Sequence, residues 1–150
     1  MRIADIYQKE GITISKNLSV HQALLKMLQE KHNSFVVLNE HNDVVGVLTL
    51  QDIAAATVPQ QFRENINMAH ALYHENFFEE QCESIKNKSV QEIMRTDFTS
   101  VTRQTNIMAI MADFLKNDLY LVPVIEEGKL IGLVTRSDIK CALAQTMNIE

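Results

Sequence analysis

The chain contains few of the residues on which several common kinds of site depend. Its 150 residues include four glycines, two prolines, two cysteines and no tryptophan. Cys82 and Cys141 fit neither a zinc spacing nor a disulfide framework. The glycines form no P-loop and no dinucleotide fingerprint, and no Gly-x-Ser-x-Gly elbow is present. We therefore expect reduced thiols and a protein that is not an enzyme, with no metal and no catalytic residues.

An excess of basic residues and a long apolar run are also missing. The formal net charge is -5, whereas a nucleic-acid polymer requires a basic face that displaces counterions. No apolar run approaches the roughly 18 residues of a membrane span, and Arg2 and Asp5 interrupt the place where a secretory signal would lie. We expect a cytoplasmic protein with no nucleic-acid polymer and no membrane among its partners.

The chain does contain an internal repeat. The stretch "GVLTLQDI" (Gly46–Ile53) returns as "GLVTRSDI" (Gly132–Ile139). Upstream, apolar residues at the spacing of an amphipathic helix recur 87 positions later. These predicted buried faces are Val20, Ala23, Leu24, Met27 and Leu28 in the first copy and Ile107, Ile110, Met111, Phe114 and Leu115 in the second.

Each copy predicts strand, helix, strand, strand, helix. The runs "SFVVL" and "VVGVLTL", and their counterparts "LYLVPVI" and "LIGLVT", have the β-branched composition of strands. A unit of roughly 50 residues buries too little surface alone. We therefore predict a mixed α/β (α+β) fold in which two β-α-β-β-α repeats, residues 1–57 and 89–150, pack as a pseudo-twofold pair.

A helical insertion, residues 58–88, is predicted between the two repeats. Residues at helical spacing support it: Phe62, Ile66, Ala69, Tyr73 and Phe77. It could cover the pair or mediate self-association. His70 and His74 would lie one turn apart on it and could share a metal, but we favour two histidines on a solvated face.

The repeated phrase has two interpretations. Thr49 with Asp52, and Thr135 with Asp138, match a capping box, which satisfies amides at a helix start and needs no ligand. The same helix start favours an anion, Arg136 adds a positive charge, and an aspartate one turn in can accept hydrogen bonds from the hydroxyls of a ribose. The spacing alone leaves both interpretations open.

The two long motifs "FVVLNEHNDVVGVLTLQDI" and "VPVIEEGKLIGLVTRSDI" resemble a tandem cystathionine-β-synthase (CBS) domain pair, or Bateman module. The resemblance covers both repeats and leaves out the insertion. It implies a stand-alone, non-catalytic regulatory module that senses an adenosine-containing ligand between the repeats. The ligand would be AMP, ADP or ATP, with S-adenosylmethionine as the lesser alternative. The signal would be a change in repeat orientation or dimer geometry, within a homodimer or toward an unidentified effector protein.

The alternative is a ligand-free protein-interaction or dimerisation module with vestigial pockets, in which the repeated phrase only caps helices. The resemblance implies two clefts. The first would consist of Thr135, Arg136, Ser137, Asp138, Ile12, His32 and Asn33. The second would consist of Thr49, Gln51, Asp52, Thr99, Leu119 and Tyr120. We expect weaker phosphate binding in the second, because Leu50 replaces a cation and Gln51 a hydroxyl.

Overall fold

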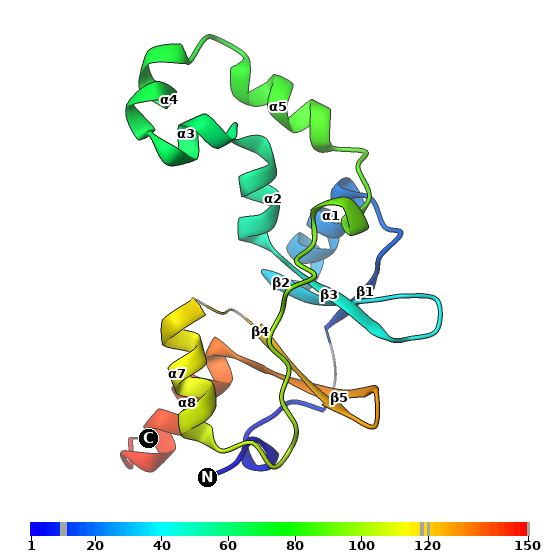
Figure 1. Cartoon of the computed structure of the whole chain (residues 1–150), viewed down its shortest axis with the longest axis vertical. Coiled ribbons are helices and arrows are strands. Elements are labelled where there is room, and N and C mark those ends of the chain that lie inside the picture. Colours follow the sequence, from blue (N-terminus) through cyan, green and yellow to red (C-terminus); the bar gives the residue numbers. More distant parts are fainter. Residues whose placement is uncertain (10–11, 118, 120, 150) are drawn as a thin grey trace.

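The computed structural model describes residues 1–9, 12–117, 119 and 121–149. Tyr120 therefore lies outside the described residues. The first repeat contains β1 (Thr13–Ser15), α1 (Val20–Glu30), β2 (Ser34–Leu38), β3 (Val44–Thr49) and α2 (Leu50–Thr57). The second contains α7 (Ile107–Asn117), β4 (Leu121–Glu126), β5 (Lys129–Thr135) and α8 (Arg136–Thr146). The predicted mixed fold of two similar repeats is confirmed, and Figure 1 shows their sheets next to each other.

The two sheets differ at the first strand of each repeat. In the first sheet, β1 runs parallel to β2 and β2 runs antiparallel to β3. In the second sheet β4 and β5 are antiparallel, and the expected first strand is reduced to a parallel bridge between Val101 and Val124. The amide of Val36 donates to the carbonyl of Ile12 at 2.8 Å. Pro123 occupies the position equivalent to Val36 and has no N–H to donate, so the second ladder is shorter.

Three clusters of buried side chains form the core. One lies within each repeat, centred on residues such as Phe35 and Ile110. The third joins the two sheets through Val36, Val47, Leu121 and Leu133. Each sheet therefore buries one face against its own helices and part of the other against the second sheet, which is why neither repeat would be covered alone.

The N-terminal segment of each repeat packs against the opposite repeat. The 3-10 helix η1 (Ile3–Asp5) lies on the second repeat, where the Ile3 amide donates to the Thr105 carbonyl at 2.9 Å. Figure 1 accordingly shows the N-terminus beside α7 and α8. Helix α6 (Val90–Ile93) lies on the first repeat, and the Val90 amide donates to the Leu18 carbonyl at 2.7 Å. We call residues 6–9 and 93–99, where the chain passes from one repeat to the other, the crossing segments.

The glycine of each repeated phrase allows a crossing segment to approach the sheet. Arg95 forms a bridge with Val47, and Gln8 forms the equivalent bridge with Leu133. A Cβ at Gly46 would lie 2.7 Å from the carbonyl oxygen of Arg95. A Cβ at Gly132 would collide with the backbone of Gln8 and the ring of Tyr7. The glycines therefore recur because the backbone of a second chain segment occupies the space of a side chain.

Helices α1 and α7 only partly bury their predicted apolar faces. Val20, Ala23, Met27 and Ile110 are buried. By contrast, Leu28 is 72% exposed and Leu115, its counterpart, is 88% exposed. The prediction that these leucines are buried was wrong for the chain as it stands, because the apolar stripe is wider than the contact with the sheet.

The insertion is helical, as predicted, but it consists of α3 (Gln60–Glu64), α4 (Ile66–Leu72) and α5 (Phe77–Ile85). The pattern is interrupted at Asn65 and again at Tyr73, both of which have extended backbone. Helix α4 ends before His74, so His70 and His74 do not share a helix as expected. The His74 ring instead contacts Phe77 edge-on, with centroids 4.9 Å apart.

Among residues 1–9, 12–117, 119 and 121–149, no cluster of three or more histidine, cysteine or acidic side chains could hold a metal ion. In that same part of the chain, every helix is too short or too polar to cross a membrane.

Candidate functional site

The two repeated Thr-x-x-Asp units form complete capping boxes. The Thr49 amide donates to Oδ2 of Asp52 at 2.8 Å, and the Asp52 amide donates to Oγ1 of Thr49 at 3.3 Å. At the start of α8, the corresponding distances between Thr135 and Asp138 are 2.7 and 3.4 Å. The structural interpretation of the phrase is therefore correct in both repeats. It uses Oδ2 and leaves the second oxygen of each carboxylate for another contact.

The second oxygen of each aspartate accepts a hydrogen bond from a crossing segment. Arg95 donates from Nε to Oδ1 of Asp52 at 3.0 Å. Gln8 donates from Nε2 to Oδ1 of Asp138 at 2.9 Å. Gln8 and Arg95 are 87 positions apart and are equivalent under the repeat. The two sites thus share one geometry, with a cation in one and a neutral amide in the other.

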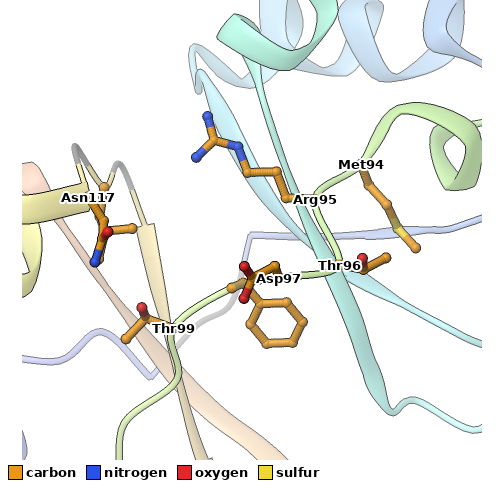
Figure 2. Close-up of a pocket in the computed structure, with 8 residues that line it drawn as sticks. Met94, Arg95, Thr96, Asp97, Thr99 and Asn117 are labelled. Atoms are coloured by element: carbon orange, nitrogen blue, oxygen red, sulfur yellow. The ribbon is translucent and has the colours of Figure 1, made fainter.

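A cavity of about 590 Å³ opens between the repeats on the Arg95 side. Its lining consists of Met94, Arg95, Thr96, Asp97, Phe98, Thr99, Asn117 and Leu119. Figure 2 shows that most of these side chains come from one crossing segment, with Asn117 facing them from the end of α7. A volume of this size is typical of small-molecule pockets, which range over roughly 300–1,000 Å³.

Three of the residues predicted for the second cleft line this cavity or the hollow beside it. Thr49, Thr99 and Leu119 line a smaller hollow that shares Arg95 and Asp97 with the cavity. Asp52 is joined to the same place through Arg95. Its side chain is 10% exposed. Gln51 is exposed on the first turn of α2.

The residues predicted for the first cleft are less concentrated. Thr135 and Asp138 are joined by the cap and Ser137 is exposed on α8. Ile12 packs against the cluster between the sheets. His32 and Asn33 follow the end of α1, and the carbonyl of Asn33 accepts from the Leu50 amide at 2.8 Å.

Arg136 was predicted to belong to the first cleft. The structure shows its Nε donating to the carbonyl of Leu119 at 2.7 Å. Leu119 lines the cavity on the Arg95 side. The guanidinium of Arg136 is therefore anchored to a residue of the other cleft.

Sequence analysis missed Arg95 and Asp97. The repeat did contain the necessary signal, because a shift of 87 positions aligns Arg95 with Gln8 and both precede the first strand by the same distance. The prediction of weaker phosphate binding in the second cleft considered the cation missing at Leu50 and the hydroxyl missing at Gln51. It did not consider a cation that reaches Asp52 from 43 positions further along the chain.

Comparison with known proteins assigns the family. The family model described as the CBS domain matches residues 3–58 and 90–145. The chain therefore belongs to the CBS domain family and contains two copies of that domain. The recognition made from the two long motifs is confirmed.

Similarity to a curated relative extends over nearly the whole chain. Protein MJ1232 of Methanocaldococcus jannaschii, itself described as uncharacterized, is 27% identical over 140 residues, which are 93% of this chain and 38% of that protein. The chain thus spans less than half of that relative's length.

Two solved structures share the fold along their whole length. The structure of CBSX2 in complex with AMP has a TM-score of 0.73 and 21% identity, covering 97% of this chain and 98% of that one. The CBS domain pair of protein MJ0100, in complex with 5′-methylthioadenosine and S-adenosyl-L-methionine, has a TM-score of 0.71 and 22% identity at the same coverage.

Proposed function

We propose that this protein is a non-catalytic regulatory module that senses an adenosine-containing ligand between its CBS repeats. The observation that carries the proposal is the inter-repeat cavity lined by Arg95, which donates to one oxygen of the capping aspartate Asp52. The solved CBS pairs with AMP and with S-adenosyl-L-methionine support the class of ligand. AMP, ADP and ATP are the ligands we favour, and S-adenosylmethionine is the alternative.

In this mechanism the ribose of the ligand binds Oδ1 of Asp52 or of Asp138, the outer oxygen that the cap does not use. A carboxylate oxygen accepts more than one hydrogen bond, so a ribose hydroxyl can join Arg95 or Gln8 without breaking the cap. Because each crossing segment connects the two repeats, a ligand that binds one segment and the opposite helix start favours one relative orientation of the repeats. A ligand shifts that equilibrium only by its difference in affinity for the two orientations.

The test is isothermal titration of the whole chain with AMP, ADP, ATP and S-adenosylmethionine. Asp52→Asn and Asp138→Asn serve as site variants, because asparagine keeps an acceptor for the threonine amide and so preserves part of the cap. We expect saturable binding in the wild type that one of the two variants weakens by at least tenfold. Silence from all four ligands would refute the sensor and leave the interaction module as the function.

A second candidate function, self-association, is favoured by the exposed apolar surface. Helices α1 and α7 expose Leu24, Leu25, Leu28, Met108 and Leu115. Large exposed apolar patches are typical of protein interfaces. A groove that includes the exposed Met108 is lined by Ile107, Met108 and Met111 of α7 and by Leu143 of α8.

We propose that the module is a homodimer that uses this surface. Light scattering of the protein as it elutes from a size-exclusion column measures its mass and tests the proposal. Leu28→Glu and Leu115→Glu together should convert a dimer to a monomer. Leu72→Glu, on the exposed side of α4, is the matched control and should leave the dimer intact. A wild-type monomer at all concentrations would contradict the proposal.

A further inference from the structure

Gln8 and Arg95 give the two clefts different charges at one equivalent position. Both residues form backbone bridges with the last strand of the opposite sheet, Gln8 with Leu133 and Arg95 with Val47. Both side chains donate to the outer oxygen of a capping aspartate, at 2.9 and 3.0 Å. A ligand held in the same pose in either cleft would therefore meet a neutral amide in one and a guanidinium in the other.

Arg95 has donors to offer beyond its contact with Asp52. That contact uses Nε, and a guanidinium carries further N–H donors on its terminal nitrogens. Its planar fork matches the oxygens of a phosphate. The Arg95 side chain is 42% exposed and lines the cavity, where Figure 2 shows it extending from the crossing segment. A phosphate in the cavity could thus reach Arg95 while Asp52 keeps its hydrogen bond.

The rest of the cavity supports one phosphate better than a chain of three. Thr96, Thr99 and Asn117 supply hydroxyl and amide groups. The carboxylate of Asp97 lines the same cavity and opposes additional negative charge. Among the lining residues that the structure describes, Arg95 is the only cation, and it already pairs with the carboxylate of Asp52. The lining therefore leaves little surplus positive charge for further phosphates.

We propose that Arg95 makes the cavity on its side selective for the 5′-monophosphate of adenosine, whereas the cleft at Gln8 does not discriminate in favour of a phosphate. This inference rests on the proposed function, because it names the ligand class of a site that must first bind adenosine. It also reverses the order expected from the sequence, in which the cleft at Asp52 had the weaker phosphate site.

The experiment compares AMP, ATP and adenosine by isothermal titration of the whole chain. All proteins carry Asp138→Asn, so that the cavity at Arg95 dominates the binding. We expect AMP to bind more tightly than adenosine or ATP. Arg95→Gln, which installs the residue of the other cleft, should weaken AMP about 10- to 100-fold, as for loss of a hydrogen bond to a charged group. The same variant should change adenosine binding less than about threefold.

Two further variants sharpen the test. Arg95→Lys keeps the positive charge without the planar fork of the guanidinium. We expect its affinity for AMP to lie between that of the wild-type residue and that of Arg95→Gln. Asp97→Asn should improve ATP relative to AMP, because the opposing carboxylate is gone. Melting temperatures accompany every titration. If Arg95→Gln unfolds at too low a temperature to be titrated, Arg95→Lys and Asp97→Asn test the selectivity instead. The quantities compared are then the affinity for AMP relative to adenosine and the affinity for AMP relative to ATP.

The outcomes separate this inference from the sensor itself. If AMP and adenosine both bind and Arg95→Gln weakens them equally or not at all, the charge selectivity is refuted while the adenosine sensor stands. If none of AMP, ADP, ATP, S-adenosylmethionine and adenosine binds the wild-type chain, the sensor is refuted and the selectivity with it.

Discussion

The two repeats have nearly the same local chemistry, and they differ in what reaches them from the rest of the chain. Each has a threonine cap, an aspartate that closes it and a glycine that admits a crossing segment. The first repeat receives Arg95 and the second receives Gln8. The two repeats therefore share the framework of the candidate site, and the residue that contacts the capping aspartate is charged in one crossing segment and neutral in the other.

The repeats also differ in how closely they are packed, and four substitution experiments can break or sharpen this comparison. The largest effect is expected at the glycines. Gly132→Ala should destabilise the protein by about 3 kcal/mol, the upper end of the range for overpacking, because the new methyl group would collide with the Gln8 backbone and the Tyr7 ring.

Gly46→Ala is the matched substitution in the first repeat and should cost less. Its nearest neighbours are the Arg95 carbonyl and the side chain of Met94, both at 2.7 Å, and a methionine can move aside. Urea unfolding measures both free energies. Equal costs at the two glycines would show that the crossing segments pack with the same tightness.

The second prediction concerns the ladder that differs between the sheets. Val36→Pro should cost about 2 kcal/mol, since it removes the hydrogen bond from Val36 to the Ile12 carbonyl and leaves that acceptor without its donor. Pro123→Val is the reciprocal change and should stabilise slightly, by about 0.5–1 kcal/mol, by supplying the missing donor. Denaturant unfolding provides both values, and a neutral Val36→Pro would contradict this explanation of the shorter second ladder.

The third prediction concerns the caps. Thr49→Ala and Thr135→Ala each remove the acceptor of a capping box, which typically costs about 0.5–2 kcal/mol. Thr49 is buried and Thr135 is only partly buried. We therefore expect the Thr49 substitution to cost about 1 kcal/mol more. Thermal unfolding with serine at each position as the control, which restores the hydroxyl, separates capping from packing.

The smallest effect should come from acid titration of the two exposed ion pairs. Arg103 donates to Glu126 at 2.6 and 2.9 Å, and these hydrogen bonds lower the pKa of Glu126 below its ordinary value of 4.5. At the corresponding turn of the first repeat, a hydrogen bond from Asn17, with a smaller effect of Lys16 at 3.7 Å, lowers the pKa of Glu40.

Because both folded-state pKa values are lowered, each pair stabilises the protein above the unfolded-state pKa. That contribution is lost as the pH falls through the folded-state pKa. Arg103→Gln should therefore reduce the loss of stability below about pH 4.5 more than Lys16→Gln does. Urea midpoints between pH 3 and 6 measure both slopes, which should be shallow because exposed pairs contribute little. Identical slopes for the two variants would contradict this ranking.

Much of the fold could be predicted because it depends on local patterns. The apolar, β-branched composition of "SFVVL" placed β2 at the observed residues, and the spacing of Val20, Ala23 and Met27 placed the buried face of α1. The capping boxes were also local, since the threonine and the aspartate lie one helical turn apart. Predictions failed where the apolar stripe of a helix is wider than the surface that covers it, as at Leu28 and Leu115. Burial of these leucines depends on a contacting surface that local sequence patterns do not encode.

The candidate site likewise has parts that local patterns predict and parts that they do not. The sequence by itself determined the duplication, the two helix starts and the aspartates that close them, because these depend on contacts within a few residues. Only the tertiary structure decided that Arg95 contacts Asp52 and Gln8 contacts Asp138. Those pairs lie 43 and 130 positions apart. They meet because each crossing segment packs on the opposite repeat, at a glycine whose missing side chain gives it room.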